Sequence, residues 1–389
     1  MHPSHKRAAA LTLLLVFFLS LVPSGALALV QPPYATEPAS DVWRTYDPAL
    51  HYYYQQLSEA EKRLFSARYD AIVTGDAELF DYQRNQLDAT GVSRVNFVLL
   101  YDCPELMITE VDFFTDNYWF TVGFEDLEWH ASFIAEALPA ALAAVERIRE
   151  RPEWGETDFE KEIACDRFLV EACEYSLDIG NLVYDTSIRT AYSALAFGQA
   201  VCEGYARSAQ LALRCLGVPC LFLIGEVNTG IIPVGNMAPG GHAWNLVQIS
   251  GAWYHYDPTW DDADEADYYE DFFPYLNVSG GLMRLNRSLD MSFSALGFSI
   301  PPNTASAGYY YTLKGQVLDE GWRDVLYQAV KDAAAEGRHG LGFYVPDDTT
   351  FNEIADECLS HPFQFSLRIA LSLDMVKFNE ARCLYFCWN

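Results

Sequence analysis

The sequence predicts an α+β fold, in which helices come first and a hairpin-rich antiparallel sheet follows. Two patterns support this prediction. Segments with apolar residues at helical spacing, bounded by helix start and stop signals, dominate the first half of the chain. Short alternating segments at 242–249 and 253–256 flank Ser250-Gly251, which is typical of a hairpin turn. Aromatic residues make up 15% of the 389 residues, which favours a packed core over disorder.

Four helices are expected in the first 216 residues. Ser58 and Glu61 form a capping-box pattern, and Gly75 ends the segment that they open. Pro139 is expected to kink or break the second helix. Asp158 is expected to cap the third helix. The predicted helical segments are 58–75, 127–150, 158–177 and 201–216.

Strands are expected where short apolar or alternating runs lie between turn residues. The Ser- and Pro-rich segment 288–306 is interpreted as a connector. After it, helices at 317–335 and 351–359 alternate with short strands. The predicted strand segments are 92–101, 107–122, 220–227, 242–249, 253–256, 341–345 and 382–388.

The first 28 residues have the composition of a signal peptide. Lys6 and Arg7 precede the apolar run 8–22, and Ala26 and Ala28 complete an A-x-A cleavage pattern. An uncleaved N-terminal anchor is the alternative. No second apolar run of membrane length follows, so no membrane span is expected after cleavage. We therefore expect a secreted or extracytoplasmic protein, with cell-surface association as a further expectation.

Net charge and cysteine content narrow the possible partners. The formal net charge is −29, which disfavours binding to the phosphate backbone of nucleic acids. The chain has nine cysteines. In an exported protein eight of them could form four disulfides and leave one free thiol. The alternative is that all nine are reduced and that several are buried as small apolar side chains.

The candidate free thiol is Cys202, which lies where the fourth predicted helix begins. A helix N-terminus stabilises a thiolate, and its free N–H groups can bind an oxyanion. Glu203 next to it opposes the thiolate unless its side chain points away. His242 begins one strand of the predicted hairpin, and Asp257 follows the other within a residue or two of the opposite position. A thiol, an imidazole and a carboxylate together form an activated cysteine nucleophile.

Each of these residues also has a purely structural interpretation. A cysteine in an apolar helix is usually a core residue, and Asp257 before a proline can simply begin a turn. His255 shares a strand face with Asp257 and is a rival base. Trp244 and Trp260 fit the packing of the sheet at least as well as the lining of a groove. The order and spacing of the three candidates favour the catalytic interpretation.

Three motifs resemble the core motifs of the transglutaminase-like superfamily, which shares a papain-like cysteine fold. They are Cys-x-Gly-Tyr-Ala at 202–206, Gly-His-Ala-Trp-Asn at 241–245 and Tyr-x-Tyr-Asp-Pro-Thr-Trp at 254–260. The resemblance implies a core in which the helix that bears the nucleophile packs on an antiparallel sheet. It implies Cys202 as nucleophile, His242 as base and Asp257 as the orienting carboxylate. It also suggests Tyr192 as a donor to the oxyanion.

The resemblance and the segment pattern divide the chain into four parts. These are a signal peptide at 1–28, an N-terminal α+β region at 29–150, a transglutaminase-like catalytic domain at 151–289 and a C-terminal α/β region at 290–389. No cofactor or metal site is expected, since the acidic stretch 261–271 lacks calcium-loop spacing. The expected partner is a peptide or protein substrate, including one associated with the cell wall. The alternative is a non-catalytic binding protein that keeps the fold.

Overall fold

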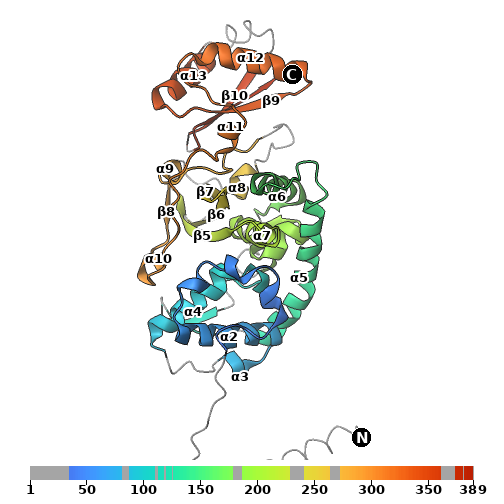
Figure 1. The fold of residues 1–389 in the computed structure, drawn as a ribbon, viewed down its shortest axis with the longest axis vertical. Coiled ribbons are helices and arrows are strands. Elements are labelled where there is room, and N and C mark those ends of the chain that lie inside the picture. The colour runs from blue at the N-terminus through green and yellow to red at the C-terminus, as the bar shows by residue number, and fades with distance from the viewer. Residues whose placement is uncertain are drawn as a thin grey trace, which may run out of the picture. The chain divides into compact units, whose positions relative to one another are not determined.

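The structure of the protein is a computed structural model (Figure 1). It describes residues 35–80, 87–109, 113–117, 120–124, 126–177, 186–227, 241–262, 272–360, 373–379 and 381–388. Residues Thr36–Asn389 group into one unit by their contacts. The predicted signal peptide lies outside the described residues. Within the described residues, no helix combines the length and the apolar character that crossing a bilayer requires.

The helices concentrate in the first half of the chain, as the sequence predicts. The long ones are α2 (Glu59–Thr74), α4 (Ala89–Asp102), α5 (Leu127–Ile148), α6 (Asp158–Ala172), α7 (Cys202–Cys215), α12 (Trp322–Ala335) and α13 (Asp348–Ser360). The short helices are α3 (Ala77–Phe80), α8 (Pro258–Asp261), α9 (Gly280–Met283), α10 (Met291–Ala295) and α11 (Tyr310–Leu313). The 3-10 turns include η2 (Pro48–Leu50), η5 (Pro104–Leu106) and η7 (Thr186–Arg189). A π-helical turn is η8 (Ser193–Phe197).

A four-stranded antiparallel sheet forms the centre of the fold, with strand order β7-β6-β5-β8. Its strands are β5 (Cys220–Val227), β6 (Gly241–Ile249), β7 (Ala252–Tyr256) and β8 (Arg287–Leu289). Helix α7 packs against β5 and β6. Ser250 and Gly251 both have positive φ angles, of 52° and 82°, as a tight hairpin turn requires. The predicted hairpin and the predicted α+β class are confirmed.

The prediction of a strand at 92–101 is wrong, because this segment forms most of helix α4. Asp88 caps this helix by accepting a hydrogen bond from the Gly91 amide. The helix contacts α2 on one side and β5 on another, and most of its residues are buried. A helix that is covered on several sides lacks the one-sided apolar pattern of a surface helix, and a short apolar run then resembles a strand.

Other boundaries also differ from the predictions. Thr157, and not Asp158, caps α6 in a capping box with Glu160, and the helix ends at Ala172 instead of 177. Helix α5 continues through Pro139. The predicted connector 288–306 contains α10 and the end of β8, whose pairing with β5 makes it part of the central sheet. Such pairing depends on tertiary contacts that local composition does not encode.

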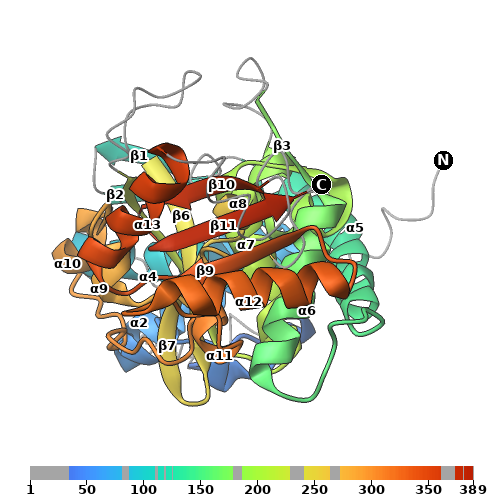
Figure 2. The same cartoon turned by 90° about the horizontal axis from the view of Figure 1, so that it is seen from above.

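Two smaller sheets lie outside the centre. A hairpin of β1 (Phe113–Asn117) and β2 (Phe120–Phe124) falls in the region where strands are predicted. Near the C-terminus, β9 (Gly340–Tyr344), β10 (Leu373–Phe378) and β11 (Cys383–Trp388) form a sheet in the order β10-β11-β9. Helices α12 and α13 pack against its outer strands β9 and β10, respectively (Figures 1 and 2). The sequence did not predict β10. The domain boundaries stay predictions.

Candidate active site

Cys202 is the first residue of α7, as the sequence predicts. No side chain caps this helix, because the residue at the cap position is Val201. The first amides of a helix have no partner within the helix, and the Cys202 thiol at this end of α7 is partly exposed. The N-terminus of α7 therefore offers both a positive helix dipole for a thiolate and N–H donors for an oxyanion.

Two glycines allow the chain to bring Cys202 to this position. Gly198 has a φ of 87° where the chain leaves η8. Gly204 faces the backbone of the preceding segment so closely that an added Cβ would stand 2.4 Å from the Ile188 carbonyl oxygen and 2.2 Å from the Ser193 hydroxyl. Any larger residue at position 204 would push the N-terminus of α7 away from η7 and η8.

His242 and Asp257 meet across the central hairpin. The register pairs Asn245 with Tyr256, so Asp257 lies diagonally across from His242, two residues from the opposite position. The imidazole Nε2 and the carboxylate Oδ2 are 2.8 Å apart, and both side chains are buried. The predicted proximity of these two residues is thus present in the structure.

The pKa of His242 depends on both Asp257 and Cys202. Burial lowers its pKa, but the charge and hydrogen bond of Asp257 and the adjacent Cys202 thiol outweigh burial and raise the pKa to about 9. With Nε2 bonded to Asp257, the remaining ring nitrogen Nδ1 is the one available to Cys202. An imidazolium beside a thiol favours the thiolate.

Glu203 does not oppose a thiolate at Cys202 as an unpaired charge. Its Oε1 accepts hydrogen bonds from Arg207, and its Oε2 lies 3.2 Å from Nη1 of Arg189. These two guanidinium groups neutralise the carboxylate and hold it in place. The expected opposition of Glu203 to the thiolate is therefore reduced by pairing with two arginines, which the sequence did not predict.

Asn245 fixes the helix that carries Cys202 to the sheet that carries His242. Its Nδ2 donates 2.9 Å to the Ala206 carbonyl in α7 and 3.2 Å to the Leu221 carbonyl in β5. Asn245 is fully buried. One amide thus joins three elements of the site, which gives a physical reason for asparagine in the Gly-His-Ala-Trp-Asn motif.

Arg287 belongs to the site, although the sequence analysis did not identify it. It stands at the start of β8, and its Nη2 donates 2.7 Å to the same Asp257 oxygen that bonds His242. Its guanidinium carbon lies 4.1 Å from the ring centre of Trp260, over the face of the indole. The positive charge and the hydrogen bonds of His242 and Arg287 keep the pKa of buried Asp257 below its usual value, against the effect of burial.

Tyr175, which the sequence did not predict as a site residue, lies beside the nucleophile. Tyr175 follows α6, and burial and the adjacent Cys202 thiol raise its pKa, while a hydrogen bond from the Cys202 amide to its phenol opposes the rise. Tyr192 instead packs in an aromatic row between Phe133 and Phe197. The parallel pairing of Tyr175 with Ala200, which brings it there, has no local sequence signal.

His255 has a different environment from His242. Its Nδ1 accepts a hydrogen bond of 2.9 Å from the indole of Trp244. Burial and the nearby Arg287 and Arg284 lower its pKa to about 3, so it stays neutral and its Nδ1 is occupied. Trp244 is 1% exposed, which fits the packing interpretation of this residue. Trp260 packs on His242, Tyr275 and Arg287.

The nine cysteines are all free thiols, so none of the disulfides considered for the sequence is present. An odd number of cysteines therefore does not single out Cys202. Burial raises the pKa of most of the other cysteine thiols. The thiols with a raised pKa are those of Cys103, Cys165, Cys173, Cys215, Cys220, Cys358 and Cys383. Residues 228–240 and 263–271 lie outside the described part of the chain.

One family model and two solved structures are similar to parts of this chain. Residues 146–258 match the family model described as the transglutaminase-like superfamily. A solved structure of a TGase shares 19% identity over 33% of this chain and 32% of its own length, with a TM-score of 0.27. A candidate cysteine protease from Cytophaga hutchinsonii shares 17% identity over 34% of this chain and 39% of its own, with a TM-score of 0.25. The chain thus spans under two fifths of the length of these structures. No curated protein matches the chain.

Proposed function

We propose that the transglutaminase-like domain at residues 146–258 makes this chain a cysteine-dependent acyl-transfer enzyme that acts on peptide or protein amides. The observation that supports this most strongly is the position of His242. It is bonded to Asp257 on one side and adjacent to Cys202 on the other, with a pKa raised to about 9. A base oriented in this way is the requirement for activating a thiol.

In the first step, the Cys202 thiolate attacks the carbonyl carbon of the amide. The negative charge moves to the carbonyl oxygen, where N–H groups in the first turn of α7, beyond the Cys202 amide that is bonded to Tyr175, can stabilise it. The imidazolium of His242 then gives its proton to the amide nitrogen, the C–N bond breaks, and the amine leaves. A thioester on Cys202 remains, and His242 is neutral.

In the second step, an acceptor attacks the thioester carbon. Neutral His242 removes a proton from the acceptor, the C–S bond breaks, and the thiolate and imidazolium are restored. Water as acceptor gives hydrolysis, and an amine gives transamidation. Asp257 keeps the imidazole in the tautomer that places a lone pair toward Cys202, and it stabilises the imidazolium.

Alkylation by iodoacetamide tests the activation of Cys202. Cys215 and Cys387 are also partly exposed and form no disulfide, so they serve as internal controls in the same chain. We expect Cys202 to react fastest at pH 7, and His242→Ala to slow its alkylation without changing that of Cys215 or Cys387. Alkylation of Cys202 at the rate of the controls, or unchanged by His242→Ala, would overturn the proposal and favour the non-catalytic binding protein.

We also propose that the chain is exported, because the composition of residues 1–28 fits a signal peptide. Cell-wall peptides then belong to the substrates that the enzyme can reach. Mass spectrometry of the mature N-terminus tests this proposal. A chain that begins at Leu29 and is recovered outside the cytoplasm supports export, whereas an intact chain in the cytoplasm contradicts it.

A further inference from the structure

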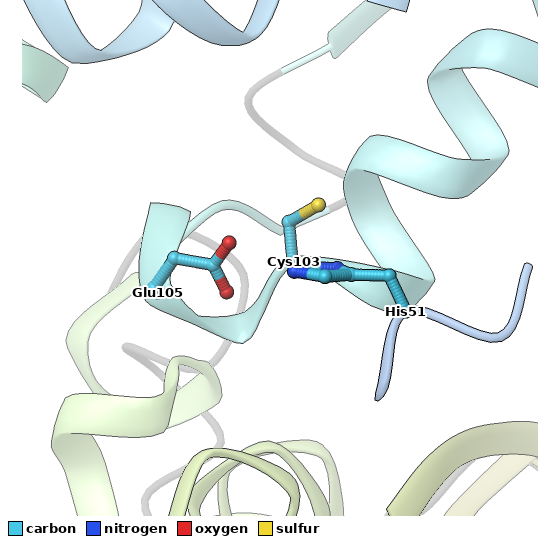
Figure 3. A group of neighbouring side chains, drawn as sticks. All are labelled: His51, Cys103 and Glu105. Atoms are coloured by element: carbon cyan, nitrogen blue, oxygen red, sulfur yellow. The ribbon is translucent and has the colours of Figure 1, made fainter. Parts of the chain in front are cut away.

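Three potential metal ligands meet at a site that the acyl-transfer chemistry does not use (Figure 3). They are His51, which follows η2, Cys103 at the end of α4, and Glu105 in η5. Each offers one ligand atom, and these atoms lie within 4.8 Å of one another. All three residues are 0% exposed. In Figure 3 the carboxylate of Glu105 points toward the other two side chains.

His51 is oriented as a metal-ligating histidine would be. Its Nδ1 lies 3.1 Å from the Asp102 carbonyl oxygen, which can only accept, so Nδ1 carries the proton and Nε2 carries the lone pair. Nε2 is buried and has no hydrogen-bond partner among the described residues. Stacking on Trp43 and Tyr46 fixes the plane of the ring. In metal sites, the histidine ring nitrogen that does not bind the metal usually donates its N–H to a backbone carbonyl, a carboxylate or a water.

Glu105 is also held in place, and it keeps capacity for a metal. Its Oε1 accepts from the Tyr69 hydroxyl at 2.9 Å, and its Oε2 accepts from the Tyr46 hydroxyl at 2.7 Å. A carboxylate offers about four acceptor positions, and the two tyrosines and the backbone amide of Glu105 occupy three of them, so one position stays open for coordination. Hydrogen bonds to a ligating carboxylate are typical of metal sites.

The charges around the cluster suit a divalent cation. Asp102, whose carbonyl bonds His51, forms an ion pair with Arg214 in which the two charged atoms are 2.6 Å apart, and this pair carries no net charge. A thiolate and a carboxylate in this interior would carry two uncompensated negative charges. A divalent cation would balance the charge of the deprotonated ligands.

We propose that His51, Cys103 and Glu105 bind a structural zinc ion, or a transition-metal ion of similar preference, in the N-terminal region. Sulfur, imidazole nitrogen and carboxylate oxygen together match the ligand preference of zinc. Binding forms bonds from the metal to Cys103 Sγ, His51 Nε2 and Glu105, and the thiol proton leaves to solvent. The ion would join the segment before α2 to the end of α4.

Cobalt is a suitable probe because a Co²⁺–thiolate bond gives a ligand-to-metal charge-transfer absorption. The full chain is produced in medium supplemented with Co²⁺, so that the ion can enter before the site is buried. All proteins carry Cys202→Ala, because Cys202, His242 and Asp257 are a second set of potential ligands. We expect one Co²⁺ per chain and a thiolate charge-transfer band.

Substitutions then locate the bound ion. Cys103→Ser is expected to abolish the band, and Glu105→Gln, which keeps an acceptor for a tyrosine, is expected to weaken Zn²⁺ binding by more than about 10-fold. Cys165→Ser is the matched control, since Cys165 is equally buried and lies outside the cluster. It should keep both the ion and the band. A folded Cys202→Ala protein without metal, or a band that survives Cys103→Ser, would overturn the proposal.

A second measurement decides the question if Cys103→Ser does not fold. X-ray absorption of the Zn²⁺-loaded Cys202→Ala protein reports the atoms around the metal without altering the cluster. We expect one sulfur neighbour, with nitrogen and oxygen in the remaining positions. No sulfur neighbour, or more than one, would overturn the proposal.

Discussion

Arg287 and His242 donate to the same oxygen of Asp257, at 2.7 Å and 2.8 Å. The shared acceptor makes Arg287 part of the arrangement that orients the candidate base. Arg287 comes from β8, the strand at the opposite edge of the sheet from β7, after which Asp257 lies. Its side chain is 1% exposed, so its charge is compensated mainly by Asp257 and by the face of Trp260.

Arg287→Gln is expected to slow acyl transfer without removing any reacting group. A hydrogen bond to a charged group contributes about 1.5–3 kcal/mol, which corresponds to a loss of about 10- to 100-fold in kcat. KM should change little, since Arg287 acts through Asp257. Arg284→Gln is the matched control, since Arg284 has no ion pair with Asp257 among the described residues. Equal kcat values for the two variants would contradict the positioning role.

Replacing each tyrosine by phenylalanine distinguishes the roles of Tyr175 and Tyr192 in catalysis. We propose the Tyr175 hydroxyl, which lies beside Cys202, as an oxyanion donor. Tyr175→Phe removes this hydroxyl, and the loss of one oxyanion donor costs about 10²- to 10³-fold in kcat. Tyr192→Phe removes a hydroxyl from the aromatic row that contains Phe133 and Phe197, and we expect nearly full activity. Steady-state rates of the two variants decide between them. The reverse order of effects would show that Tyr192, as the family resemblance suggests, is the donor.

The raised pKa of His242 has consequences for pH dependence. A pKa of about 9 means that His242 holds a proton at neutral pH, so acylation of the enzyme by an amide should decline as pH rises through about 9. The folded protein binds this proton more tightly than the unfolded chain, whose histidine has a pKa of about 6.5. The resulting stabilisation is fully present below pH 6.5 and is lost as pH rises through about 9.

Nitrogen chemical shifts of the His242 ring, followed by NMR, test this value directly. Asp257→Asn removes the attraction that raises the pKa, so its titration should move to lower pH. His255 provides an internal comparison, because its pKa of about 3 predicts no titration between pH 5 and 10. A His242 titration near 6.5 that is insensitive to Asp257→Asn would contradict the assignment of Asp257 as its partner.

Arg214 is expected to be essential for stability. It is fully buried in α7, and it donates to the Asp102 carboxylate at 2.6 Å, the Asp102 carbonyl at 2.7 Å and the Cys220 carbonyl at 2.7 Å. Arg214→Met leaves Asp102 charged and buried, so we expect a loss of about 3–5 kcal/mol in the free energy of unfolding.

Urea unfolding measures this loss. Arg149→Met is the matched control, because the Arg149–Glu146 pair is exposed and such pairs contribute at most about 1 kcal/mol. A difference below about 1 kcal/mol between the two variants would show that Arg214 does not fasten the helix of Cys202 to the N-terminal region.

The sequence was sufficient for the parts of the site that rest on local signals. Cys202 begins a helix with a clear stop signal, and His242 and Asp257 flank a two-residue turn, so hairpin geometry alone places them near one another. Arg287 and Tyr175 had no such signal. Each reaches the site through a strand of only two or three residues, whose pairing is set by tertiary contacts.

The metal-ligand cluster illustrates the same limit. Cys103 and Glu105 are near in sequence, but His51 is far from them and the three share no zinc-binding motif. The pattern at 92–101 predicts a strand where α4 forms, so the position of Cys103 at a helix end was not predicted. Contacts between distant segments of a buried core are not encoded in local periodicity.

Formation of a thioester on Cys202 tests the central claim most directly. A small activated ester, such as p-nitrophenyl acetate, needs no knowledge of the natural substrate, and peptide mapping by mass spectrometry locates the acyl group. We predict rapid acetylation of Cys202, loss of the acyl group with hydroxylamine, and a strong decrease of acetylation in His242→Ala. Acetylation of Cys202 that is no faster than that of Cys387, or that is unaffected by His242→Ala, would contradict the account.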